Sequence, residues 1–260
     1  MKLKAVKSIK APQILENPAG KGIVVFIHGF MGNPRQFGKY AEVMYRLGYS
    51  VFSLLLPGHG GTSKDFASGT FERWQNHVNS EIEAISRNHS DIWIAGHSMG
   101  GLLAVNAAVK FYRHVRGIFL IACPFKVKVF SLYAMKVRIR LIFSRKDDPK
   151  KAAYRDASSL SPSLSLVWRA AGPVAELRKL IRAAKRNLEE IRTPVTAVYS
   201  TADELISMES LDILKSGLLK APLKQVLLSD SLHAYYPEHE MSVIERNLIK
   251  MPFFRGEPSL

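Results

Sequence analysis

The stretch Ile92–Gly101 constrains the fold of this chain more than any other part of its sequence. A short apolar run, Ile-Trp-Ile-Ala, is typical of a buried strand, and it leads directly into Gly-His-Ser-Met-Gly. A mostly apolar helical pattern follows over 102–109. A strand that reverses into a helix within so few residues forces Ser98 into a tight, strained turn. We expect Gly96 and Gly100 to be required there, because a Cβ atom at either position would collide with a neighbouring strand or helix.

A serine held in such a turn needs partners before it can react. It requires a histidine base, a carboxylate that orients this base, and two N–H donors for the developing oxyanion. One donor is expected from Met99, which follows the serine, and the other from the loop after an earlier strand. The apolar run 22–27 ends in His28-Gly29-Phe30. This order puts the second donor at Phe30, lets the backbone at Gly29 approach the substrate, and leaves His28 to fix the turn by hydrogen bonds.

The acid and the base are expected after two later strands, in the chain order serine, acid, histidine. The strand-like segment 194–200 leads into Asp203, and the strand-like segment 224–229 leads into His233. Both residues therefore occupy equivalent positions at successive strand ends. His233 is the histidine that follows a predicted strand late in the chain, so it is the candidate base.

Other residues compete for these roles. Glu204 and Asp230 are neighbouring carboxylates that could orient the histidine, and Asp203 is preferred because it comes first after its turn. His97 is the variable residue of Gly-x-Ser-x-Gly, a position that more often packs than reacts. We predict that it borders the bound substrate. His59 is assigned a structural role.

Taken together, these motifs resemble the α/β-hydrolase superfamily, and within it the bacterial carboxylesterase and monoacylglycerol lipase branch. The resemblance spans most of the chain from Gly22 onward and rests on five sites: His-Gly-Phe (28–30), Leu-Pro-Gly-His-Gly-Gly-Thr (56–62), Gly-His-Ser-Met-Gly-Gly (96–101), Asp203 and His233. It implies a catalytic triad of Ser98, Asp203 and His233, an oxyanion hole at Phe30 and Met99, and substrate contacts from Phe30, Gly29 and His97. It implies no cofactor and no metal.

The activity expected from this resemblance is hydrolysis of a carboxylic ester or acylglycerol through an acyl-enzyme on Ser98. The same fold and triad also support peptidases, thioesterases and C–C bond hydrolases, and the serine turn does not separate them. A non-catalytic ligand-binding protein is the alternative from a different class. Such proteins usually lose one triad member, whereas this chain keeps all three.

The order of elements predicts an α/β fold with a mostly parallel sheet and helices on both of its faces. The expected strands lie near 22–28, 49–56, 91–96, 116–122, 194–200 and 224–229, and the expected helices near 34–47, 70–87, 99–113, 207–215 and 238–249. The segment before Gly22 is expected to add a short antiparallel hairpin.

The alternation breaks over 124–190, which we interpret as a cap inserted into a core of 1–123 and 191–260. This insertion leaves the core at the carboxyl edge of a strand, so it is expected to cover the active site. Its last part has apolar residues at helical spacing after Gly172-Pro173. Lys126–Phe130 and Lys136–Leu141 alternate charged and apolar residues, which favours strands and leaves helices as an alternative.

The charge of the chain is concentrated in this insertion. Residues 124–190 carry sixteen Lys and Arg against six Asp and Glu, a net charge of +10 out of +15 for the whole chain. The simpler explanation for this positive charge is a solvated surface. The more specific explanation is weak contact with an anionic membrane surface or attraction of an acidic substrate. No nucleic-acid-binding module is recognisable. One cysteine, Cys123, and an N-terminus without an apolar signal core favour a cytoplasmic enzyme.

Overall fold

The computed structural model describes residues 11–128, 145, 147–159 and 169–254. Within them, one sheet of seven strands has the order β1-β3-β2-β4-β5-β6-β7. Its strands are β1 (Gln13–Leu15), β2 (Ile23–Ile27), β3 (Ser50–Ser53), β4 (Ile92–His97), β5 (Val115–Ile121), β6 (Val195–Ser200) and β7 (Leu223–Leu228). All neighbouring strands pair in parallel except β1 and β3, which confirms the predicted mostly parallel sheet.

The edge strand β1 lies in the segment that was expected to add a hairpin before Gly22. β1 pairs antiparallel with β3, with Gln13 opposite Ser53 and Leu15 opposite Val51, and the hairpin stays a prediction because residues 1–10 lie outside the described residues. The strand that follows β1 in the chain, β2, is bonded on both of its edges, to β3 and to β4. Because β2 has no free edge, β1 extends the sheet beyond it.

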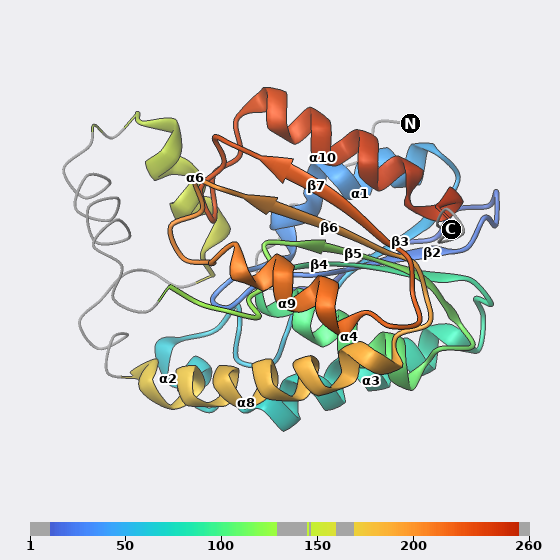
Figure 1. Cartoon of the computed structure of the whole chain (residues 1–260), viewed down its shortest axis with the longest axis horizontal. Helices are drawn as coiled ribbons and strands as arrows, with labels where there is room; N and C mark the ends of the chain where they lie inside the picture. Colours follow the sequence, from blue (N-terminus) through green and yellow to red (C-terminus); the bar gives the residue numbers. More distant parts are fainter. Residues whose placement is uncertain (1–10, 129–144, 146, 160–168, 255–260) are drawn as a thin grey trace.

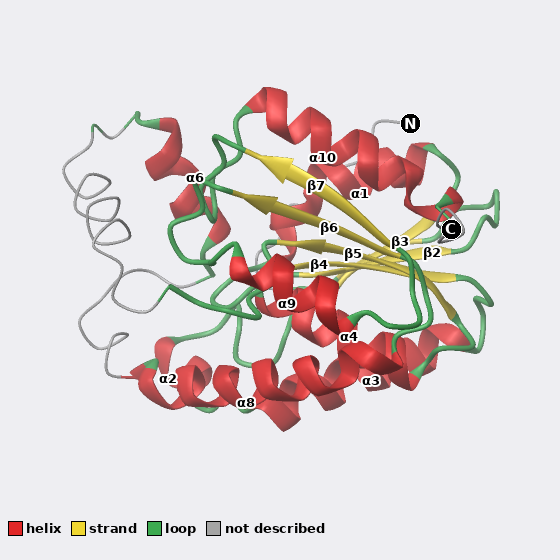
Figure 2. Cartoon of the chain, viewed as in Figure 1, coloured by secondary structure: helices red, strands yellow, loops and turns green. Residues whose placement is uncertain are grey.

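Helices cover both faces of the sheet (Figures 1 and 2). One face carries α1 (Gly38–Arg46) and α10 (Glu238–Lys250), and the other carries α3 (Phe71–Ser86), α4 (Met99–Lys110) and α8 (Ala171–Asn187), with α9 (Glu209–Gly217) beside α8. Each helix expected from the sequence is present, with ends shifted by a few residues. Two short helices, α2 (Ser63–Ala67) and α6 (Pro149–Ala157), were not expected.

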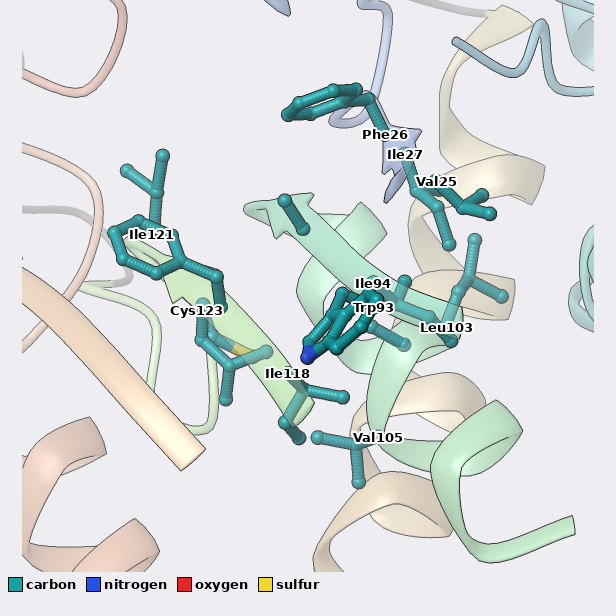
Figure 3. Close-up of a cluster of buried hydrophobic side chains, with 14 of the residues drawn as sticks. Val25, Phe26, Ile27, Trp93, Ile94, Leu103, Val105, Ile118, Ile121 and Cys123 are labelled. Carbon is teal, nitrogen blue, oxygen red and sulfur yellow. The ribbon is translucent and has the colours of Figure 1, made fainter. Parts of the chain in front are cut away.

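The core lies between the central strands and α4. Every residue of β2 and β4 is buried, which is why both strands appear in the sequence as continuous apolar runs. Figure 3 shows part of this core, with Ile94 of β4, Ile118 of β5 and Cys123 near Leu103 and Val105 of α4. Removing a large apolar side chain from water stabilises the fold by about 1.5–3 kcal/mol. This packing holds the carboxyl ends of β4, β6 and β7 in fixed relative positions.

The described part of the insertion contains two α-helices, α6 and α8. The short helix α6 lies beyond the carboxyl ends of β6 and β7, whereas α8 runs along the outside of α4 (Figure 1). The helix predicted from apolar spacing is therefore confirmed as α8, which buries Leu180 and Ala184. The division into a core and a cap over 124–190 stays a prediction.

The first alternating segment of the insertion, Lys126–Phe130, forms one isolated bridge between Val127 and Ile206 in its described part. The second, Lys136–Leu141, lies outside the described residues. In the part of the chain that the structure describes, no helix is both long and apolar enough to cross a lipid bilayer.

Candidate active site

Ser98 sits in the strained turn between β4 and α4. Its backbone has φ 52° and ψ −121°, a conformation that non-glycine residues rarely adopt. A Cβ atom at Gly100 would lie 2.0 Å from the carbonyl oxygen of Ile27, and one at Gly96 would lie 2.4 Å from the carbonyl oxygen of Gly100. The backbone N–H of Ser98 donates to the carbonyl of Ile121, 2.8 Å away, at the end of β5. The turn is therefore locked by contacts with both neighbouring strands.

His233 and Asp203 meet Ser98 at the carboxyl edge of the sheet. The Nε2 atom of His233 lies 3.0 Å from Oγ of Ser98, and its Nδ1 atom lies 2.9 Å from Oδ2 of Asp203. The other oxygen of Asp203, Oδ1, accepts backbone N–H groups from Leu205 (2.8 Å) and Ile206 (2.9 Å). With both oxygens engaged, the carboxylate has a fixed orientation toward the imidazole.

Asp203 and His233 shift each other's pKa so that each favours its charged form. Burial lowers the pKa of His233, but the charge and hydrogen bond of Asp203 and the charge of Glu204 outweigh it, so the pKa of His233 is raised. Burial raises the pKa of Asp203, but the neighbouring imidazole and two backbone N–H groups outweigh it, so the pKa of Asp203 is lowered. Asp203 is thus ionised at neutral pH, and the imidazole is more basic than a free histidine.

The competing carboxylates make other contacts. The Oε2 atom of Glu204 accepts the backbone N–H of His233 at 2.9 Å, and its Oε1 atom accepts the hydroxyl of Tyr154. Asp230 is exposed and pairs with His239, 3.1 Å away. Of the three carboxylates, Asp203 is the one whose oxygen is hydrogen-bonded to the ring of His233.

The two expected oxyanion donors border the turn. Met99 is the first residue of α4, so its N–H has no partner within the helix ladder. Phe30 lies in the loop after β2, which passes close to the turn: a Cβ atom added at Gly29 would lie 3.1 Å from Cβ of Ser98. Two backbone N–H groups near one serine hydroxyl can stabilise an alkoxide-like oxygen.

Two histidines hold the loop that carries Phe30. The Nε2 atom of His28 accepts the N–H of Leu56 at 3.1 Å, while its Nδ1 donates to the carbonyl of Gly29 at 2.9 Å. His59 accepts the N–H of Met31 at 3.2 Å, and burial lowers the pKa of His59 to about 4. These contacts are those of neutral rings that fix a loop, as expected from the sequence.

His97 links three parts of the site. Its Nε2 donates to the backbone carbonyl of His233 at 3.0 Å, and its Nδ1 accepts the amide of Gln36 at 3.0 Å. Gln36 in turn accepts the N–H of Gly29 at 3.2 Å. Burial lowers the pKa of His97 to about 3, so the ring stays neutral. Sequence analysis did not single out Gln36, whose only signal is its place shortly after the His-Gly-Phe loop.

The surroundings of the turn are apolar on two sides. The ring of Phe30 packs edge-on against Phe66 at 4.9 Å and against Trp74 at 6.2 Å, between ring centroids. A separate cavity of about 350 Å³ adjoins His97. It is lined chiefly by apolar and aromatic side chains under α6: Phe37, Tyr40, Ile121, Ala153, Tyr235, Tyr236, Met241 and Ile244. Neither Ser98 nor His233 lines this cavity.

A group of potential metal ligands lies outside the site. Asp230, His239 and Glu240 come close together among the described residues. Glu240 accepts backbone N–H groups from Ser229 and Asp230 and the hydroxyl of Ser231, so this group is already used in local hydrogen bonding.

The fold and the site geometry define the class of this protein. A mostly parallel sheet with a serine turn after β4 and an aspartate and a histidine after β6 and β7 is the architecture of α/β-hydrolases. A profile of the serine aminopeptidase S33 family (Hydrolase_4) matches residues 18–240, so the chain belongs to this family.

Two curated relatives that match most of this chain are a lipase and an esterase. The chain is 25% identical to a thermostable monoacylglycerol lipase from Bacillus sp. (strain H-257), covering 86% of this chain and 88% of that protein. It is 21% identical to a carboxylesterase of Bacillus subtilis (strain 168), covering 79% and 82%. The structure of a monoacylglycerol lipase from Paleococcus ferrophilus superposes with a TM-score of 0.70 at 18% identity, covering 94% and 98%.

Proposed function

We propose that this protein is a serine hydrolase that cleaves carboxylic esters through an acyl-enzyme on Ser98. The observation that carries the proposal is the continuous chain of hydrogen bonds from Oγ of Ser98 through His233 to Asp203. Hydrolase relatives named as a monoacylglycerol lipase and a carboxylesterase support the same reaction class.

The reaction follows from the placement of the groups. Nε2 of His233 takes the proton of Ser98 as Oγ attacks the ester carbonyl, while Asp203 stabilises the imidazolium that forms. The N–H groups of Phe30 and Met99 hold the oxyanion. When the tetrahedral intermediate collapses, His233 protonates the leaving alkoxide and the acyl group stays on Ser98. Water then cleaves the acyl-enzyme by the same steps in reverse. The sequence of steps needs no metal or cofactor.

The substrate class is a small ester or acylglycerol. Phe30 is partly exposed beside the serine turn, and the fully buried rings of Phe66 and Trp74 support it, so its apolar face suits an acyl chain. Gly29 leaves room for the substrate oxygen, and His97 contributes a neutral ring beside the cavity under α6. Monoacylglycerols and short-to-medium-chain esters are therefore the first substrates to test.

Aminopeptidase activity is the rival suggested by the family description. An aminopeptidase needs a carboxylate that binds the free amino group of its substrate. The buried carboxylate nearest the triad, Glu204, already accepts hydrogen bonds from His233 and Tyr154. The strongly basic insertion also repels an ammonium group. Both observations favour the ester over the peptide.

Replacing the nucleophile tests the proposal directly. Ser98→Ala is expected to keep the fold, measured by circular dichroism, and to lower turnover of p-nitrophenyl esters and monoacylglycerols roughly 10⁶-fold. A fluorophosphonate probe is expected to label the parent protein and not the variant. Ester cleavage near the parent rate in Ser98→Ala would exclude the proposed nucleophile.

The proposal includes the cellular setting of the enzyme. A cytoplasmic location is supported by a single cysteine, Cys123, kept as a buried thiol. Weak contact with anionic membrane surfaces is supported by the exposed cations of α8, among them Arg178, Arg182 and Arg186. Such contact would bring the enzyme to lipid substrates.

A further inference from the structure

A second buried carboxylate lies next to the triad, and the reaction above does not use it. Glu204 has 1% of its surface exposed and Asp203 has 2%, so two adjacent acidic side chains are both withdrawn from water. Burying a carboxylate is costly unless hydrogen bonds and charges compensate for it. An apolar residue would fill this space without that cost, so the charge of Glu204 calls for an explanation.

The contacts of Glu204 join two distant parts of the chain. One oxygen accepts the backbone N–H of His233, which fixes the main chain of the catalytic loop. The other oxygen accepts the hydroxyl of Tyr154, which belongs to α6. Burial and the charge of Glu204 raise the pKa of Tyr154, so its phenol keeps its proton and remains the donor.

The C-terminal end of α6, just after Tyr154, is tied to the oxyanion loop. The side-chain amide of Asn33 donates to the carbonyls of Asp156 (3.0 Å) and Ala157 (3.2 Å). The N–H of Ser159 donates to the carbonyl of Met31 at 2.7 Å. α6 therefore bridges the loop after β2 and the loop that carries His233, and Glu204 is its anchor on the His233 side.

We propose that Glu204 is a positioning residue for the reaction, holding the backbone of His233 while its charge stabilises the imidazolium, and that Tyr154 of α6 acts through it. The proposal rests on the proposed role of His233 as the catalytic base. It gives the two carboxylates separate tasks: Asp203 orients the ring, and Glu204 fixes the loop that carries the ring.

The two effects of Glu204 can be separated by substitution. Glu204→Gln keeps both hydrogen bonds, since the amide oxygen can accept the N–H of His233 and the amide nitrogen can donate to the Tyr154 oxygen, but it removes the charge. Glu204→Leu removes charge and hydrogen bonds together. Tyr154→Phe removes the link to α6 and leaves the charge in place.

The pH profile of kcat/KM reports the charge effect. The charged and titratable groups around His233 are Asp203, Glu204, His97, Tyr154, Tyr236 and, through the carbonyl of Asp203, Lys128. Only ionisation of His233 is expected to set the acid limb. Because the charge of Glu204 raises the pKa of His233, Glu204→Gln is expected to move this limb to lower pH. The matched control is Glu209→Gln, an exposed glutamate nearby, which is expected to leave the limb in place.

The link to α6 has its own readout. Tyr154→Phe is expected to lower kcat/KM several-fold without moving the acid limb. Glu204→Leu is expected to lower it about 10-fold or more, and adding Tyr154→Phe to that variant is expected to cost nothing further, because both changes break one path. The Gln variant keeps the proposal testable even where the Leu variant does not fold.

Two results would overturn the proposal: an acid limb unchanged in Glu204→Gln, or additive losses in the double variant. Titration of the His233 ring by NMR, assigned with His233→Gln, measures the same pKa change without any substrate. A pKa change there in a protein that cleaves no ester would refute the proposed function and leave the role of Glu204 intact. If the parent cleaves esters but the pKa of His233 does not change in Glu204→Gln, the proposed function stands and the role of Glu204 is refuted.

Discussion

His233 is held by four contacts that come from two segments, the end of β4 with the turn that follows it, and the loop after β6. Its ring bonds to Ser98 and Asp203, its backbone N–H to Glu204, and its backbone carbonyl to His97. A base that is fixed at ring and backbone loses little orientational freedom when the substrate arrives, which is how enzymes lower the entropy cost of proton transfer.

The orienting acid can be tested against a matched neighbour. Asp203→Asn is expected to lower kcat by about 10⁴-fold, because an amide in place of the carboxylate favours the wrong imidazole tautomer. Asp230→Asn makes the same chemical change at an exposed aspartate that bonds to His239, and it is expected to have little effect. Steady-state kinetics on one p-nitrophenyl ester measure both. Equal losses would mean that Asp203 does not orient His233.

Sequence analysis found the triad residues, which follow particular strands in a known chain order, and missed the polar residues that have no such place in the order. Ser98, Asp203 and His233 follow strands at positions that the fold dictates, and the structure brings their side chains into hydrogen-bond contact. Gln36 and Tyr154 could not be found in this way. A polar residue on a helix carries no positional signal, and its contact with His97 or Glu204 exists only after the chain has folded.

At the scale of elements, the buried strands were predictable and the short helices were missed. Strands covered on both faces appear as uninterrupted apolar runs, which few other structures require. The missed helices have signals that lie outside apolar periodicity. In α2, Thr62 and Asp65 form a capping box, and α6 begins with a capping Asp148 followed by Pro149. Capping patterns therefore add information where a helix has too few buried residues to show a period.

The serine turn should be intolerant of even one methyl group. In Gly100→Ala the new Cβ would meet the backbone of Ile27, which cannot move without disturbing β2. We expect a loss of stability of about 1–3 kcal/mol or more and a lower Tm, together with loss of activity. Gly172→Ala is the control: apart from its chain neighbours and its own helix, no described atom lies within 4 Å of an added Cβ, so the loss of stability is expected to be much smaller. Equal melting temperatures for the two variants would contradict this picture of the turn.

At the scale of the whole molecule, the positive charge is unevenly arranged. Arg178, Arg182 and Arg186 recur every four residues along α8, so they form one exposed stripe on the face of the molecule opposite α1 and α10 (Figure 1). Each cation near an anionic membrane contributes about 1 kcal/mol of attraction, which salt weakens.

Two variants that have the same net charge, but lose positive charge from opposite faces, can test whether α8 contacts a membrane. The parent protein is expected to sediment with vesicles that contain phosphatidylserine at low salt and to detach as salt increases. Replacing the three arginines of α8 by glutamine is expected to abolish sedimentation. Replacing Lys39, Arg46 and Lys250 of α1 and α10 removes the same charge from the other face and is expected to have a smaller effect. Equal effects would assign the attraction to total charge, and no sedimentation of the parent would exclude membrane contact.

The single thiol of the chain has a practical consequence. Cys123 is fully enclosed beside Gly101, and burial raises its pKa well above the ordinary value for cysteine. A maleimide reagent needs an accessible thiolate, so the native protein offers it almost nothing to attack. One cysteine introduced on the surface would therefore carry a fluorophore or a spin label at a unique position, with no need to remove the natural residue first.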